Sequence, residues 1–145
     1  MPESKPTADA RLTAYPRPLT EDERASLYLL LPQDAFAGVD EYRAQVDYAT
    51  AVAPCSCPCP TISIEVDRSK VRASSYRENP LPVDYIYEVP DDPEKETYWL
   101  MAWSDDGYLA GLEIAWLNNP PAELPPIHVW EPGSPDVRVP EPRSH

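Results

Sequence analysis

The stretch that most constrains the fold of this 145-residue chain is residues 97–117, TYWLMAWSDDGYLAGLEIAWL. Two apolar runs flank a turn at residues 104–107, and this turn ends in Asp-Gly. Asp-Gly between such runs favours a tight hairpin, because glycine adopts the positive φ that a two-residue turn requires. The sequence therefore predicts two antiparallel strands joined by a short turn.

Both faces of the first predicted strand are apolar. One face carries Trp99, Met101 and Trp103, and the other carries Tyr98, Leu100 and Ala102. This pattern is typical of a central strand that is covered on both sides, so we expect Trp103 to be buried. In the second strand Leu112, Ile114 and Trp116 share a face, and Glu113 lies on the opposite one.

Two short helices are expected before the strands. Residues 20–31 begin with a capping box, in which Thr20 and Glu23 satisfy each other's backbone amides, and Pro32 ends the helix. Residues 39–49 form the second helix, with one apolar face made of Val39, Tyr42, Val46 and Ala49.

Strict alternation predicts strands at residues 61–67 and 83–89, separated by a polar connection at residues 68–82. The order of elements predicts an α+β fold with two N-terminal helices packed on a four-stranded antiparallel meander. The chain divides into a mobile N-terminal arm (1–18), a single α+β domain (19–117) and a proline-rich extended C-terminal tail (118–145). Eight of the last twenty-eight residues are proline, which interior strands exclude.

The chain is strongly acidic. Twelve basic and twenty-five acidic residues give a net charge of −13. A surface of this sign repels phosphate backbones and anionic lipid and attracts basic partners, although it also serves solubility alone. We therefore expect no nucleic-acid binding. With neither a signal peptide nor an apolar run long enough to span a bilayer, we expect a cytoplasmic protein without membrane contact, whose cysteines begin as thiols.

The segment PCSCPCP at residues 54–60 holds all three cysteines, Cys55, Cys57 and Cys59. Three nearby thiolates suit Zn²⁺ or Cu⁺, and His128 is the interior candidate for a fourth ligand. The paired CxxC spacing of structural zinc sites is missing. Three interpretations stay open: a metal site, a redox pair, or thiols that pack as small apolar side chains.

The sequence offers little for catalysis. It has two histidines, one of them the last residue, and four isolated glycines without phosphate-binding spacing. We therefore expect a non-enzymatic protein without a resident cofactor. Acidic side chains are the candidates for contact with a protein partner: Asp91, Asp92, Glu94, Glu96, Asp105, Asp106 and Glu113.

Four segments resemble a group of small uncharacterised bacterial α+β proteins: LTEDERASLYLLL, GVDEYRAQV, CSCPCPTISIEVD and DDGYLAGLEIAWL. Members of the group resemble this chain in three features: an N-terminal helix pair, a cysteine-rich segment before a strand, and a closing strand with Asp-Gly-x-Leu-x-x-Leu-Glu. The resemblance spans about residues 19–126 and implies an α+β fold but no activity. Members often have glycine where this chain has Pro58. Some similar small acidic proteins look like immunity partners of polymorphic toxins.

Three functional hypotheses follow. The leading one is a non-enzymatic, acidic protein-binding factor that neutralises a basic partner, as an immunity, antitoxin-like or phage/host-interaction protein would. The second is a small Zn- or Cu-binding protein built on the three cysteines. The third is a structural component of a larger assembly, whose proline-rich ends grip its neighbours.

Overall fold

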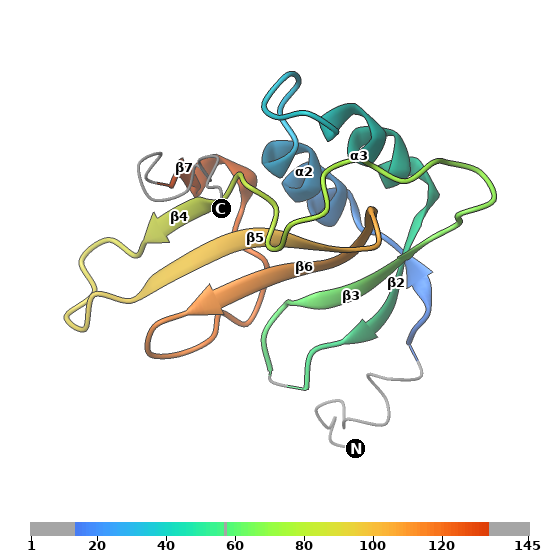
Figure 1. Cartoon of the computed structure of the whole chain (residues 1–145). Coiled ribbons are helices and arrows are strands. Elements are labelled where there is room, and N and C mark those ends of the chain that lie inside the picture. Colours follow the sequence, from blue (N-terminus) through green and yellow to red (C-terminus); the bar gives the residue numbers. More distant parts are fainter. Residues whose placement is uncertain (1–13, 57, 134–145) are drawn as a thin grey trace, which may run out of the picture.

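The computed structural model describes residues 14–56 and 58–133. Within them, seven strands form one antiparallel sheet in the order β1-β2-β3-β6-β5-β4-β7. The strands are β1 (Arg17–Pro18), β2 (Ala49–Pro54), β3 (Ile62–Val66), β4 (Tyr85–Glu88), β5 (Thr97–Asp105), β6 (Tyr108–Trp116) and β7 (Glu131–Pro132). Helices α2 (Glu21–Leu30) and α3 (Val39–Gln45) lie together on one side of this sheet (Figure 1). The single-turn 3-10 helices η1 (Val46–Tyr48) and η2 (Ile127–Val129) complete the described elements.

The predicted hairpin is confirmed. β5 pairs with β6 along its length, and the turn is formed by Asp106 and Gly107, with φ of 56° and 84°. Positive φ at both central residues is the geometry that matches the twist of two antiparallel strands. The register shifts between Trp103 and Ser104, which indicates a bulge near the turn.

The predicted capping box of the first helix is also confirmed. The amide of Glu23 donates to Thr20 Oγ1 at 3.0 Å, and the amide of Thr20 donates to Glu23 Oε1 at 2.9 Å. The carboxylate of Glu23 also pairs with Arg17, the first residue of β1, at 2.8 Å. Burial raises the pKa of Glu23, but the hydrogen bond from Arg17 and the cap bring it below its ordinary value.

The four-stranded meander is wrong, although the α+β class and the antiparallel pairing hold. β3 pairs with β6, not with β4, so the hairpin lies in the middle of the sheet and β4 lies beyond it. Three further strands were not predicted: β1 and β7 lie in the predicted arm and tail, and β2 begins at the predicted helix end, Ala49, and runs to the cysteine segment. β1 and β7 pair with residues far away along the chain, which local periodicity does not indicate, whereas β2 pairs with the next strand, β3.

The second helix ends earlier than predicted. α3 stops at Gln45, η1 follows, and Ala49 already has extended backbone angles. Residues from Ala49 onward pair with β3, where Ala49 lies opposite Val66. Hydrogen bonding to a neighbouring strand therefore overrides the helical period at the end of this segment.

One face of the sheet makes the core. Leu100, Ala102, Leu112 and Ile114 of the hairpin are buried there, beside Ile62 and Ile64 of β3. The helices contribute Leu27, Leu30, Val39 and Tyr42 to the same core. In the described part of the chain, both helices cover this one face.

The prediction that β5 is covered on both sides is therefore wrong. Trp99, Met101 and Trp103 are only half-buried, and they neither belong to the core nor pack against it. Trp116 lies on the core side of β6, opposite Tyr98, but it is 37% exposed at the strand end. An apolar pattern on both faces of a strand thus corresponds here to one covered face and one accessible face.

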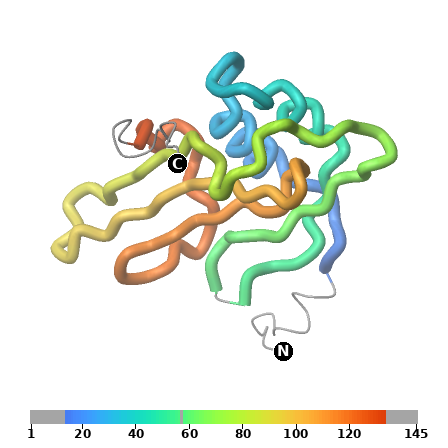
Figure 2. The backbone as a smooth tube through the Cα atoms, in the orientation of Figure 1, coloured from blue at the N-terminus to red at the C-terminus, as the bar shows by residue number. Residues whose placement is uncertain are grey.

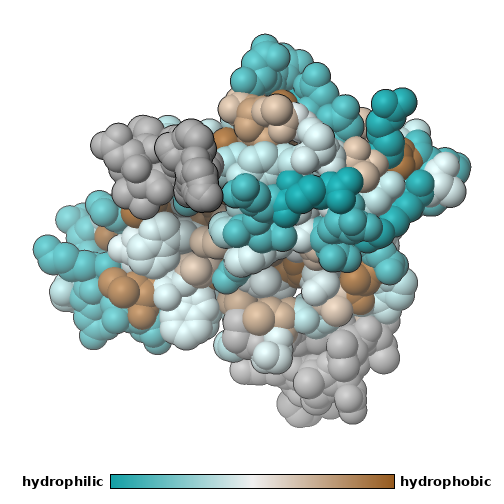
Figure 3. Space-filling model, in the orientation of Figure 1, coloured by the Kyte–Doolittle hydropathy of each residue, from teal (hydrophilic) through white to brown (hydrophobic). Residues whose placement is uncertain are grey.

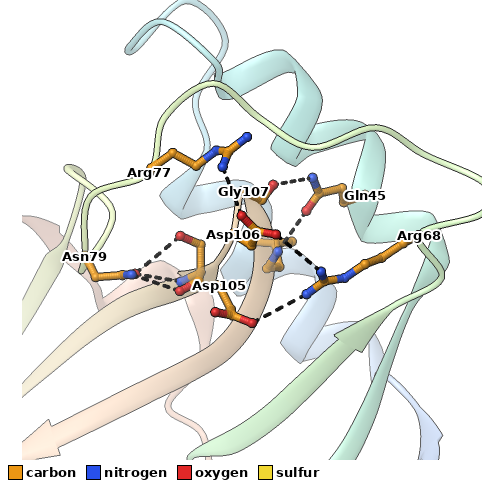
Figure 4. A network of polar contacts seen from close by, with 9 residues as sticks. Gln45, Arg68, Arg77, Asn79, Asp105, Asp106 and Gly107 are labelled. Atoms are coloured by element: carbon orange, nitrogen blue, oxygen red, sulfur yellow. Dashed lines mark hydrogen bonds and ion pairs between the residues drawn. The ribbon is translucent and has the colours of Figure 1, made fainter.

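The polar connection between β3 and β4 lies across the hairpin turn and beside α3 (Figure 2). The amide of Ser74 donates to the carbonyl of Gly107 at 2.8 Å. The fully buried Gln45 donates from Nε2 to the same carbonyl at 2.9 Å and accepts from the amide of Leu109 at 2.8 Å. Asn79 pairs with both backbone groups of Ser104 at the bulge (Figure 4). These contacts lock helix, connection and hairpin together.

The two chain ends extend beyond the described residues. Residues 1–13 of the predicted arm and 134–145 of the predicted tail lie outside them, whereas residues 17–18 and 131–132 add short strands to the two sheet edges. Trp130 is 6% exposed and lies edge-on to Tyr87, with ring centroids 6.3 Å apart. This residue therefore anchors the start of the tail to the core.

We predict that Gly107→Ala lowers the free energy of unfolding by about 1–3 kcal/mol. The new Cβ would lie 2.6 Å from the carbonyl oxygen of Ser74, at a φ of +84° that disfavours a side chain. Gly111→Ala is the matched control, because its Cβ would meet its nearest atom at 3.5 Å, and should change stability by less than about 1 kcal/mol. Urea unfolding measures both; equal effects would show that the turn is not held as described.

Candidate functional site: an open sheet face

The face of the sheet away from the helices is the accessible one. Direct partners in an antiparallel pair point to the same side, so the register assigns its members. We call this surface the open face; it includes Ser63, Glu65, Ile86, Trp99, Met101, Trp103, Gly111, Glu113 and Ala115, with the exposed Glu88 and Glu131 toward the β4–β7 edge. Figure 3 shows hydrophobic residues (brown) at the surface among paler ones over the region where Figure 1 places β4 and β5.

Glu113 lies in the middle of the apolar row on β5. It is paired directly with Met101, while Trp99 and Trp103 pair with its neighbours two positions along β6. Trp103 donates from Nε1 to Glu113 Oε1 at 2.6 Å. Gly111 lies opposite Trp103 and offers no side chain, which leaves space for the indole to lean toward Glu113. Two half-buried indoles therefore flank one half-buried carboxylate.

The two acids at the hairpin tip are paired within the chain. Arg77 contacts Asp106 at 3.1 Å, and Arg68 contacts Asp105 at 3.5 Å and Asp106 at 3.8 Å (Figure 4). All four side chains are largely exposed, so each pair contributes little to stability. These carboxylates are accessible, but they already form ion pairs with guanidinium groups of the same chain.

The acidic segment 91–96 holds residues with different roles. Asp91 and Glu94 are exposed, whereas Asp92 accepts backbone amides of Glu94 and Glu96 and so shapes the loop. Glu96 is 6% exposed, and its carboxylate accepts the amides of Leu117, Asn118 and Asn119 at 2.6–3.1 Å. This segment precedes β5, at the end of the hairpin away from Asp105 and Asp106. The fold thus does not gather the predicted partner-binding residues into one patch.

The environment of Glu96 favours its charged form. Burial raises its pKa, but the hydrogen bonds from the backbone amides of Asn118, Asn119, Leu117 and Thr97 outweigh this effect and lower the pKa below its ordinary value. Glu96 thereby fixes the chain that leaves β6 against the start of β5. Its position indicates a structural role.

The structure places His128 far from Cys55 and Cys59, the two predicted cysteine ligands that it describes. Cys55 is half-buried and Cys59 is 7% exposed and disulfide-bonded, while Cys57 lies outside the described residues. His128 is exposed in η2, just before the strand at the far edge of the sheet from β1 and β2. Among the residues that the structure describes, no three His, Cys, Asp or Glu side chains are grouped so as to hold a metal ion.

A hollow of about 290 Å³ lies beside Cys59 and is lined also by Tyr15, Arg17, Glu23 and Glu123. Its central charges, Arg17 and Glu23, satisfy each other through two hydrogen bonds at 2.8 and 2.9 Å. The open face therefore remains the better candidate site, because no Lys, Arg or His of the described residues forms an ion pair with its central carboxylate, Glu113.

Comparison of the chain with family models, with curated proteins and with solved structures gives no match. Over residues 14–56 and 58–133, no helix has the length and apolar character needed to cross a bilayer.

Sequence reasoning named Glu113 but missed the aromatic residues around it. It assigned Trp99 and Trp103 to a doubly covered core because both faces of β5 are apolar. The available signal was Glu113 itself, since an unpaired carboxylate is costly in a buried layer. A charged residue opposite Met101 therefore indicated that this face stays in contact with water.

We predict that Trp103→Ala costs about 1–2 kcal/mol of stability, because the indole is only half-buried. A buried ring would have cost about 3–5 kcal/mol. Leu100→Ala on the opposite, fully buried face of the same strand should cost about 2–5 kcal/mol. Chemical unfolding of both variants tests the one-sided core, and a larger loss for Trp103→Ala than for Leu100→Ala would contradict it.

We predict that Glu96→Gln reduces the acid sensitivity of folding. Because the folded pKa of Glu96 lies below its ordinary value of 4.5, the stabilisation is complete above that pH and is lost as the pH falls through the folded value. The variant should melt at a lower temperature at pH 7 and lose less on going to pH 3. Glu94→Gln, an exposed neighbour, should follow the wild-type curve of melting temperature against pH.

Proposed function

We propose that this chain is a non-enzymatic, acidic binding protein that neutralises a basic protein partner. The observation that carries the proposal is its charge balance: 25 acidic minus 12 basic residues leaves at least 13 carboxylates that no Lys or Arg of the chain can match one to one. Such a field speeds association with a cationic surface and disfavours anionic ones. An immunity, antitoxin-like or phage/host-interaction protein that neutralises a basic partner would use this attraction.

The open face supports the same proposal. It offers half-buried aromatic and aliphatic side chains around the carboxylate of Glu113. Protein interfaces commonly combine aromatic side chains at the centre with charged groups around them. An acidic chain with an apolar sheet face thus provides both long-range attraction and contact area for a cationic protein.

We predict that the tagged, full-length chain retains a basic protein from lysate at about 50 mM salt and releases most of it at about 500 mM, because salt screens the attraction. Mass spectrometry identifies the retained protein and its isoelectric point. Beads that carry polyglutamate are the control for charge alone. Recovery of no protein at either salt concentration, or of one that polyglutamate retains equally, would count against the proposal.

A further inference from the structure

Guanidinium groups in this protein occupy a recurrent setting, between an aromatic ring and a carboxylate. Arg17 lies 4.8 Å from the ring centroid of Tyr15 and pairs with Glu23 at 2.8 Å. Arg68 lies 4.3 Å from the ring centroid of Tyr108 and pairs with Asp105 at 3.5 Å. The ring face attracts the cation while the carboxylate accepts its N–H groups.

The centre of the open face has the same two components without the cation. Glu113 provides the carboxylate, and Trp99 and Trp103, whose indoles bind cations best among aromatic rings, lie diagonally on either side of it. Trp103 Nε1 donates a hydrogen bond to Glu113 Oε1. Among the described residues, Oε2 of Glu113 has no hydrogen bond or ion pair. Half-burial strengthens such a site, because it reduces the screening of the charge by water.

We propose that an arginine side chain of the basic partner completes this site, with its guanidinium paired to Glu113 and stacked on Trp99 or Trp103. This inference depends on the proposed function and names the contact that would carry it. Arginine fits better than lysine, because its planar group stacks on an indole and pairs with a carboxylate at the same time. The net charge of −13 attracts the partner, and the site fixes where its arginine docks.

The test uses the full-length chain and a short peptide in which arginine alternates with serine, with binding measured by calorimetry at low salt. Glu113→Gln removes the charge and keeps a carbonyl that accepts from Trp103 Nε1. Glu65→Gln removes the same charge from β3 on the same face, and is the matched control. We expect Glu113→Gln to weaken binding about tenfold and Glu65→Gln to change it less than about twofold.

A second arm replaces each arginine of the peptide with citrulline, which has the same shape and no charge, and should abolish binding. Thermal melting confirms that both variants are folded. Equal weakening by Glu113→Gln and Glu65→Gln would overturn the inference and leave the proposed attraction of a basic partner intact. Failure of the wild-type chain to bind the arginine peptide would also overturn it, whereas the proposed function fails if the lysate yields no basic partner or only one that polyglutamate retains equally.

Discussion

The carbonyl of Gly107 is the point on which the arrangement of helices, connection and sheet depends. It accepts from the amide of Ser74 at 2.8 Å and from Gln45 Nε2 at 2.9 Å, so α3 and the connection between β3 and β4 meet at the hairpin turn. Gln45 and Ser74 are completely buried, and an unpaired polar group there would be costly. Because Gln45 ends α3, these bonds hold α3 against the hairpin turn, and α2 packs beside it on the same core.

This one-sided arrangement explains how an ordinary strand pattern yields an accessible surface. Alternation along β5 sends Leu100 and Ala102 into the core and Trp99 and Trp103 to the other side. Because the helices cover Leu100 and Ala102, Trp99 and Trp103 stay half-exposed. Large aromatic side chains in that position raise the free energy of the isolated protein in water, and contact with a partner would recover it. The open face and the acidic charge thus suit the same kind of interaction.

The candidate site was only partly predictable. Glu113 was named as a contact residue because of its charge, but its neighbours Trp99 and Trp103 were assigned to the core because a single strand does not reveal which of its faces is covered. Glu96 is the opposite case, a predicted contact residue that has a structural role. It belongs to an acidic run, yet its carboxylate accepts hydrogen bonds from backbone amides more than twenty positions later in the chain. The role of a carboxylate depends on what the fold places beside it.

The sequence alone determined the local elements: the hairpin at Asp106-Gly107, the Thr20–Glu23 cap of α2, and the alternating strands β3 and β4. Turn geometry, capping and side-chain periodicity involve residues a few positions apart, so the signals lie within short segments. Only the tertiary structure decided that β3 pairs with β6, that β1 and β7 widen the sheet, and that one face of β5 remains open. Those outcomes are set by hydrogen bonds and packing between residues far apart in the chain, which no local pattern encodes.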